Sequence, residues 1–269
     1  MTTIKPKHLA GNLWEDNGQT YRITDDVTKL RQYNVLPNPD IIIGYTAAFG
    51  KSDDGQELHQ ALGAHMQIGI DRLPAKQPGE LRTVKSTLET QDQQDEYCDV
   101  PQAKLPKGQK NIWQRGHLLA RELANINHEP LNFMTLTPYA NSGSTEIHQV
   151  NGNNPEGMLY YENRLYDWLT DHQDCLLDYA VFPIYDAPSI AESLAPRRIQ
   201  LQYCGISENG DLIPIPIKVP DSIRSHTYKG AIMSVTLNNI QPGVPVDYYH
   251  GIAIPPKREK KGIADENTN

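Results

Sequence analysis

The sequence predicts an α+β fold in which a central antiparallel β-sheet is combined with few helices. Two observations predict it. Most apolar residues fall in short runs with the length and composition of strands, and only one segment has apolar residues at helical spacing. The predicted strands span residues 41–47, 64–70, 178–185, 199–206, 212–219 and 231–237.

Turn residues support the assignment of the later strands. Asn209-Gly210-Asp211 separates two of them and is typical of a hairpin turn. Pro214 and Pro216 lie in the strand that follows. Because proline has no backbone N–H, they predict that this strand lies at an edge of the sheet.

The one predicted helix runs from Pro155 to about His172. Asn154 can cap it, and Pro155 suits its first turn. Glu162 lies at the rim of the apolar face. That face is formed by Met158, Tyr161, Leu165, Trp168 and Leu169.

The composition predicts one main domain, residues 41–254, with polar ends. Residues 1–40 are polar and rich in turn residues, which predicts an irregular N-terminal extension. Residues 255–269 are charged and lack apolar periodicity, which predicts a disordered tail. There is no run of 18 apolar residues, so we expect no membrane span, and the N-terminus lacks the apolar run of a signal peptide.

Charge and cysteine content argue against two classes of protein, a chain coated in basic residues and a protein with a cysteine zinc site. The net charge of −8 argues against a chain coated in basic residues, although residues 104–121 carry enough lysine and arginine for a local basic groove. The three cysteines, Cys98, Cys175 and Cys204, form no C-x-x-C pair and give no zinc-site signal. We expect them to be buried or partly buried thiols.

The residues that indicate chemistry begin with the segment Trp-Gln-Arg-Gly-His-Leu-Leu at 113–119. Gly116 lets the backbone bend just before His117. Arg115 can hold a phosphate through paired hydrogen bonds. A general base beside a phosphate-binding arginine suits the hydrolysis of phosphodiester bonds, although a single histidine is more often structural.

Two asparagines and a glutamate could complete such a site. Asn132 and Asn141 enclose eight residues, and a side-chain amide oxygen is a ligand that Mg²⁺ accepts. Asparagine is, however, also a common turn or cap residue. Glu162 could anchor metal-bound waters, or it could be a solvated helix glutamate.

Taken in order, these motifs resemble those of the DNA/RNA non-specific endonucleases. This family of ββα-metal nucleases includes the secreted streptococcal DNases and the Serratia-type nuclease. The motifs that carry the resemblance are R-G-H before two apolar residues, N-x₈-N, Y-Y-E on a helix, and the segments 239–244 (NIQPGV) and 246–248 (VDY), which resemble the end of the streptococcal branch. The resemblance covers about residues 60–252.

The resemblance implies a ββα-metal core and a sequence-non-specific endonuclease that uses Mg²⁺ or Mn²⁺. It implies DNA and RNA as substrates, 5′-phosphate products and a secreted or cell-surface location; no inhibitor protein is identified. The site residues that it implies are His117 as general base, Asn141 as metal ligand, Asn132 steadying the site and the phosphate, Glu162 orienting metal-bound waters, and Arg115 with Arg72, or Arg82 in its place, contacting phosphate.

The chain departs from the family pattern at two points. Gln114 stands where the family has aspartate before R-G-H, and we expect this position to support the motif instead of performing chemistry. Asn141 and Glu162 are 21 residues apart, which is longer than usual and predicts a loop inserted before the helix. Two alternatives stay open: a catalytically inactive nucleic-acid-binding homologue, and a non-enzymatic secreted β-domain.

Overall fold

The computed structural model describes residues 5–30, 41–46, 50–51, 57–58, 60–74, 113–145, 149–186, 195–248 and 252–253. The predicted tail at 255–269, Arg82 and Cys98 lie outside these residues.

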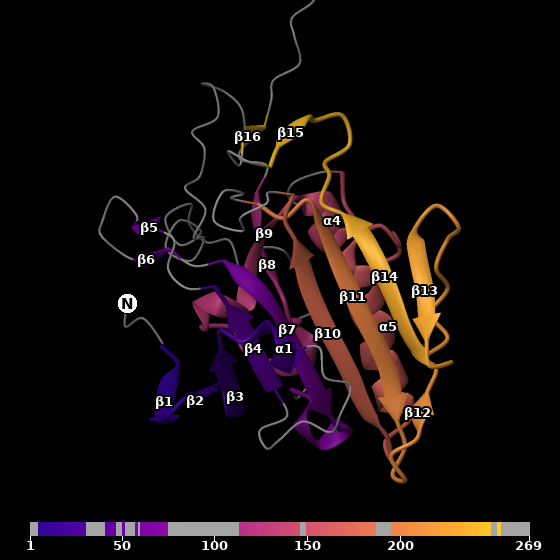
Figure 1. Cartoon of the computed structure of the whole chain (residues 1–269). Helices are drawn as coiled ribbons and strands as arrows, with labels where there is room; N and C mark the ends of the chain where they lie inside the picture. Colours follow the sequence, from indigo (N-terminus) through magenta and orange to yellow (C-terminus); the bar gives the residue numbers. More distant parts are fainter. Residues whose placement is uncertain are drawn as a thin grey trace, which may run out of the picture.

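A large mixed sheet forms the centre of the molecule (Figure 1). Its strands follow the order β1-β2-β3-β4-β7-β10-β11-β14-β13, and β12 pairs with β11. The described pairings are antiparallel except for the parallel pair β3 and β4. The strands are β1 (Lys7–Ala10), β2 (Leu13–Asp16), β3 (Gln19–Thr24), β4 (Ile41–Tyr45), β7 (Ala61–Ile68), β10 (Leu176–Ile184), β11 (Arg198–Ile206), β12 (Leu212–Ile213), β13 (Arg224–Tyr228) and β14 (Ile232–Asn238).

Three two-stranded sheets lie outside the large one. They are β5 (Gly50–Lys51) with β6 (Glu57–Leu58), β8 (Gln114–His117) with β9 (Phe133–Leu136), and β15 (Val246–Asp247) with β16 (Ile252–Ala253). The predicted α+β class is confirmed.

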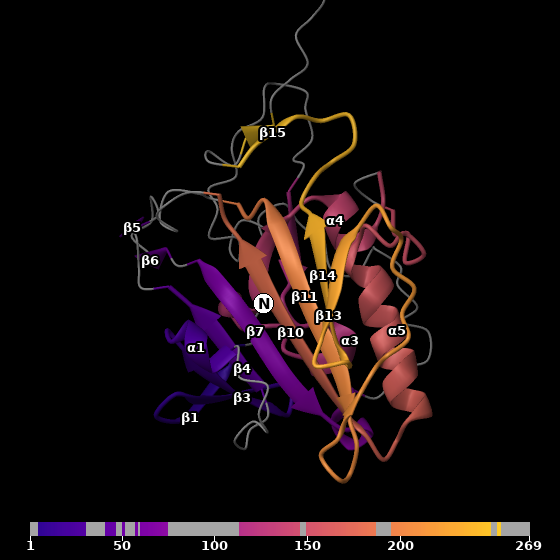
Figure 2. The same ribbon diagram turned by 45° about the vertical axis from the view of Figure 1, so that its right-hand side comes forward.

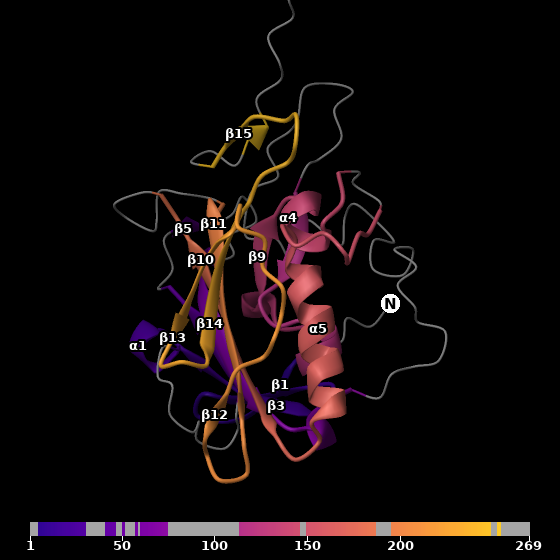
Figure 3. The same cartoon turned by 90° about the vertical axis from the view of Figure 1, so that its right-hand side faces the viewer.

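The helices are few, as predicted, and most of them lie on one face of the sheet (Figures 2 and 3). The described helices are α1 (Val27–Leu30), α3 (Arg121–Ala124), α4 (Pro138–Ser142) and α5 (Met158–Asp171), with 3₁₀ turns η1 (Ile70–Arg72) and η2 (Pro130–Asn132). In the edge-on view, α4, α5 and the β8–β9 ribbon lie on one side of the sheet and α1 on the other. The main core fills the space between α5 and the sheet.

The helix α5 begins three residues later than predicted. Asn154 does not cap it, because its amide donates to the Gly143 carbonyl (2.9 Å) and its carbonyl accepts from the Glu156 N–H (3.1 Å). Gly157 is the residue before the helix instead. The predicted apolar face is buried, and Tyr160 joins it because its hydroxyl donates to the Lys218 carbonyl.

The expectation of an irregular extension over residues 1–40 is wrong for the described part. Residues 7–24 form three strands that extend the sheet, and β3 alternates buried and partly exposed positions around the fully buried Tyr21. Asn17 and Gly18, both at positive φ, form the turn between β2 and β3. This Asn-Gly pair is the hairpin signal that the polar composition concealed.

The predicted strand at 212–219 is paired only at its first two residues, which form β12 at the predicted edge. Pro214 and Pro216 follow, and because neither has an N–H to donate, no ladder continues past them. The strand β13, in contrast, was not predicted, because its sequence RSHTY is polar and largely exposed along the sheet edge.

Three tyrosine hydroxyls in the core between α5 and the sheet make no hydrogen bond within the described part of the chain. They belong to Tyr161 on α5, Tyr179 on β10 and Tyr203 on β11, all fully buried. Tyr21 is buried to the same degree, but its hydroxyl donates to Oε2 of Glu129 at 2.7 Å. A buried hydroxyl without a partner contributes nothing that offsets its loss of hydration.

We therefore expect Tyr179→Phe to change the free energy of unfolding by less than about 0.5 kcal/mol or to raise it. Tyr21→Phe, the matched control, should lower it by about 1–3 kcal/mol, since it leaves a buried carboxylate oxygen unpaired. Urea unfolding of both variants measures the difference. Equal destabilisation by the two substitutions would show that the Tyr179 hydroxyl is bonded, for instance to a buried water.

Candidate active site

The β8–β9 ribbon brings Arg115 and His117 to one face. The two residues are two apart on β8, so their side chains point the same way, and His117 lies directly opposite Phe133. The Arg115 guanidinium lies 4.3 Å from the centre of the Phe133 ring, and the His117 ring lies 4.5 Å from it. Phe133 is thus a platform for both side chains, which the sequence analysis did not identify although it directly follows Asn132.

The surroundings of His117 keep its imidazole neutral. Burial lowers the pKa of His117 to about 3, the positive charges of Arg115 and Arg121 lower it further, and the neighbouring Asn127 side chain opposes this shift. The ring nitrogen Nε2 is itself buried. A neutral imidazole keeps a lone pair, so His117 is in the form that a general base requires over a wide pH range. Arg121 and Asn127 are neighbours that the sequence analysis did not assign to the site.

Asn141 lies on α4 beside the β8 strand. Thr137 caps this short helix by accepting from the Ala140 N–H, and Gly143 ends it at a φ of 73°. The Asn141 amide donates to Oε1 of Gln114 at 3.0 Å, which leaves its carbonyl oxygen Oδ1 for a ligand. A Cβ on Gly116 would lie 3.3 Å from that oxygen and would also collide with the Leu136 side chain. Glycine in R-G-H therefore provides space next to Asn141.

The C-terminal motif fastens the segment that carries Asn141. The Asn239 side chain accepts from the Thr137 N–H (2.8 Å) and donates to the carbonyls of Thr135 (3.1 Å) and Pro196 (2.7 Å). Gln241 accepts from the Tyr139 N–H at 3.2 Å. The motif at 239–244 thus acts on the site by holding the end of β9 and the start of α4.

Asn132 lies inside the protein and is bonded to the main chain. It is 0% exposed, its Oδ1 accepts from the Leu119 N–H, and its Nδ2 donates to the carbonyls of Leu119 and Ile126. A side chain that is buried and bonded in this way steadies the main chain of the site, and a role of Asn132 toward phosphate stays a prediction. Asn132 fastens the segment between His117 and β9.

Glu162 lies on α5 and Arg72 in η1, each with contacts in its own part of the fold. Burial is the main cause that raises the pKa of the Tyr179 hydroxyl. The negative charge of Glu162, nearby on α5, raises it further. Arg72, in η1, donates through Nη2 to Oε1 of Gln19 (3.1 Å) and to the Thr20 carbonyl (3.4 Å). Their roles toward metal and phosphate stay predictions.

The longer spacing between Asn141 and Glu162 forms a loop with a narrow neck. The Asn151 N–H donates to the Ser142 carbonyl (2.8 Å), and the Asn154 amide to that of Gly143. A Cβ on Gly157 would lie 2.7 Å from Cα of Gly143, so the two ends of the loop touch. The extra residues therefore leave α5 starting next to α4.

Comparison with solved structures finds the same fold in extracellular nucleases. One, an extracellular nuclease, is 28% identical, with 82% of this chain and 98% of the other covered and a TM-score of 0.54. Another, an extracellular endonuclease, is 29% identical, with 84% and 93% covered and a TM-score of 0.54. NucA from Streptococcus agalactiae, solved with a magnesium ion bound, is 15% identical, with 90% and 86% covered and a TM-score of 0.46. No protein-family model and no curated protein matches this sequence.

The chain is a structural relative of the extracellular nucleases. The predicted resemblance to the non-specific endonucleases and the predicted ββα-metal nuclease fold are confirmed. In this fold the R-G-H residues lie on β8, Asn132 ends η2 directly before β9, and Asn141 lies on α4, which precedes α5.

The pKa of His117 predicts how the nuclease fold responds to acid. In the unfolded chain the pKa of a histidine is about 6.5, so its imidazole is protonated as the pH falls below 6.5. In the folded protein His117 stays neutral until about pH 3. The stabilising contribution of neutral His117 is thus complete above pH 6.5 and is lost as the pH falls through this window. The variant His117→Leu should lose less stability than wild type between pH 7 and pH 4.5 in urea unfolding. An equal loss would mean that His117 titrates near its ordinary pKa.

Proposed function

We propose that the protein is a metal-dependent endonuclease that hydrolyses phosphodiester bonds of DNA and RNA with little sequence preference. The observation that carries the proposal is the neutral His117 held on Phe133 beside Arg115, with the carbonyl oxygen of Asn141 available on the neighbouring helix. The two structural relatives described as extracellular nucleases support it.

The residues around Asn141 fit a hard divalent cation. Among the described residues, no group of three or more histidine, cysteine, aspartate or glutamate side chains could hold a metal ion. A single amide oxygen completed by waters suits Mg²⁺ or Mn²⁺, which prefer oxygen and retain water, better than zinc, which takes nitrogen and sulfur ligands. The hydrogen bond from Asn141 to Gln114 turns the amide so that its oxygen is the atom available. Such an ion would supply positive charge that neutralises the phosphate.

The protein's own groups then have distinct roles. Neutral His117 takes a proton from the attacking water. The Arg115 guanidinium, oriented by the Phe133 ring, binds the phosphate, and Arg121 adds positive charge nearby. Attack by external water needs no 2′-hydroxyl, so both DNA and RNA are substrates and 5′-phosphate ends are expected. Contacts to phosphate carry no sequence information, which explains the lax preference.

Gln114 bears on the alternative that the chain is an inactive binding homologue. Its Oε1 accepts a hydrogen bond from the Asn141 amide, as a carboxylate oxygen at this position would. The substitution therefore preserves the orientation of Asn141 and favours an active enzyme over an inactive one.

We also propose that the enzyme acts outside the cell. Two of its structural relatives are described as extracellular. No helix among the described residues is long and apolar enough to cross a membrane.

Plasmid cleavage by the purified protein tests the proposed function. Cleavage should require Mg²⁺ or Mn²⁺ and stop with EDTA. His117→Ala should lower the rate by about two to four orders of magnitude, the usual contribution of a general base. His226→Ala, on the exposed edge strand β13, is the control and should keep the wild-type rate. Full activity in EDTA, or a His117→Ala variant as fast as wild type, would sink the proposal.

Substitutions at Gln114 test how the metal ligand is oriented. A glutamine can also present its N–H₂ to Asn141 and occupy the carbonyl oxygen, whereas a carboxylate can only accept. Gln114→Glu, of the same length, should therefore lower the Mg²⁺ concentration for half-maximal activity by about tenfold, roughly one charge-assisted hydrogen bond. Gln114→Leu should raise it. A Mg²⁺ titration that is identical for both variants would separate Gln114 from metal binding.

A further inference from the structure

The orientation of Asn141 depends on the open end of the β8–β9 ribbon. At this end Gln114 lies opposite Leu136, the first residue of β8 opposite the last of β9. Gln114 accepts from the Asn141 amide at 3.0 Å, and Asn141 lies on α4, which follows β9. Two short strands do not hold each other in place unaided. The way α4 lies against β8 must therefore be set by other parts of the chain.

The C-terminal segment 239–248 fastens the β9 side of this end. The Asn239 side chain accepts from the Thr137 N–H and donates to the Thr135 carbonyl. The Thr137 hydroxyl donates in turn to the Ile240 carbonyl at 2.6 Å. Because Thr137 caps α4, these bonds fix the start of the helix that carries the proposed metal ligand.

Tyr248, the last residue of the V-D-Y motif, connects this segment to the β8 side. Its hydroxyl donates to the Asn239 carbonyl at 2.6 Å. Its ring meets the Trp113 ring edge-on, with the ring centres 6.5 Å apart. Trp113 is 5% exposed and directly precedes Gln114. One side chain therefore contacts both the residue that fastens α4 and the neighbour of the hydrogen-bond partner of Asn141.

The surroundings of Tyr248 give it a fixed position. Its carbonyl accepts from the Ala195 N–H at 3.2 Å, and the Arg197 guanidinium lies 5.8 Å from its ring centre. The Arg197 carbonyl accepts from the Asn239 N–H at 2.9 Å. The main chain of Asn239 is thus held at its N–H by Arg197 and at its carbonyl by Tyr248. A side chain can fix another segment only when its own main chain is fixed, so the hydroxyl of Tyr248 supports the bonds from Asn239 to Thr137.

We propose that Tyr248 is a positioning residue for the metal ligand: by holding the Asn239 carbonyl through its hydroxyl and Trp113 through its ring, it sets how α4 lies against β8 and keeps the carbonyl oxygen of Asn141 oriented for a divalent cation. The inference rests on the proposed function for its catalytic meaning. It gives a role to the V-D-Y motif, whose tyrosine hydroxyl is bonded within the protein.

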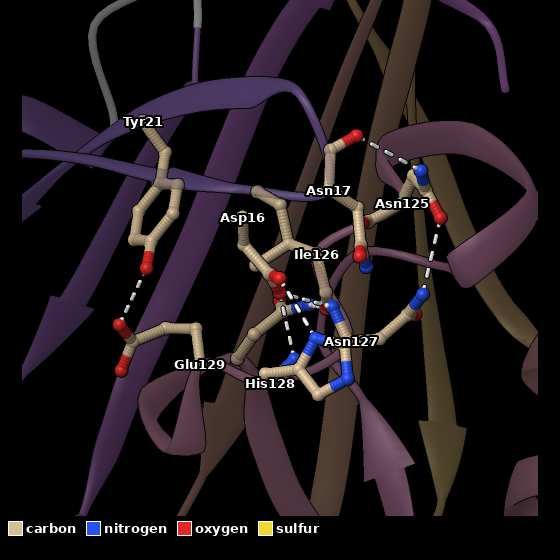
Figure 4. Close-up of polar contacts among 9 residues, drawn as sticks. Asp16, Asn17, Tyr21, Asn125, Ile126, Asn127, His128 and Glu129 are labelled. Carbon is tan, nitrogen blue, oxygen red and sulfur yellow. Dashed lines mark hydrogen bonds and ion pairs between the residues drawn. The ribbon is translucent and has the colours of Figure 1, made fainter. Parts of the chain in front are cut away.

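The connected end of the ribbon provides a matched control. The N-terminal hairpin of β2 and β3 fastens the segment that joins β8 to β9 (Figure 4). Oδ2 of the buried Asp16 accepts from the N–H groups of Asn127 (2.6 Å) and His128 (2.7 Å). The Tyr21 hydroxyl donates to Oε2 of Glu129 at 2.7 Å. Tyr21→Phe therefore removes a tyrosine hydrogen bond at the connected end, whereas Tyr248→Phe removes one at the open end.

Binding of Mn²⁺ to the full-length protein, measured by electron paramagnetic resonance without nucleic acid, tests the proposal. Tyr248→Phe should raise the dissociation constant by about fivefold, the effect of about one neutral hydrogen bond. Tyr248→Leu, which also removes the ring from Trp113, should raise it further, and Tyr248→Phe alone decides the matter if Tyr248→Leu does not fold. Tyr21→Phe should bind Mn²⁺ as wild type does. In plasmid cleavage by Tyr248→Phe, the Mg²⁺ concentration for half-maximal activity should rise by the same factor, with the rate at saturating Mg²⁺ within about twofold of wild type.

Amide hydrogen exchange gives a readout that needs neither metal nor cleavage. The Thr137 N–H should exchange about fivefold faster in Tyr248→Phe, relative to the amides of the central strand β10, and Tyr21→Phe should leave this ratio unchanged. Wild-type Mn²⁺ binding by Tyr248→Phe, or an equal loss of binding in Tyr21→Phe, would overturn the proposal. A wild-type protein that neither binds Mn²⁺ nor cuts plasmid would refute the proposed function, while the exchange of Thr137 would still decide whether Tyr248 supports the bonds that hold α4.

Discussion

The site depends on the pairing of two strands of four residues each, β8 and β9. Such a short ribbon is not stable by itself in water, so its geometry must come from its surroundings. Three buried polar side chains provide it. Asn132 fastens the segment that follows His117, Asn239 fastens the end of β9, and Asp16 fastens residues 127–128. Each bonds backbone groups, Asp16 through its Oδ2, which fixes main chain more rigidly than apolar packing alone would.

The electrostatics of the site follow from the same arrangement. Burial disfavours a positive charge on His117 most, and the positive charge of Arg115, held against the same Phe133 ring, disfavours it further. His117 is therefore neutral, the form that accepts a proton, before substrate binds. The negative charge of a bound phosphate then favours the protonated form. The protein has a net negative charge, but its site is locally positive. Its net charge therefore does not indicate which substrate it binds.

The sequence was sufficient for most of the central strands of the sheet and for α5, because periodicity is a local property. It was insufficient for β1 to β3, where short polar strands give little apolar alternation and Asn17-Gly18 was the one usable signal. Phe133 was missed because its place opposite His117 depends on the register of the β8–β9 pair, which no motif in the sequence shows. The bonds from Asn132 to the main chain could not be predicted, because a motif shows that a side chain is required without showing whether it faces solvent or main chain.

The clamp from Asn239 has a consequence for the order in which the molecule is made. Thr137, whose N–H it holds, lies 102 residues earlier in the chain. Translation releases the chain from its N-terminal end, so the segment with Asn141 leaves the ribosome long before its clamp exists. The start of α4 is fixed only when residues 239–241 emerge. The position of the proposed metal ligand is therefore completed only after nearly all of the chain has been made.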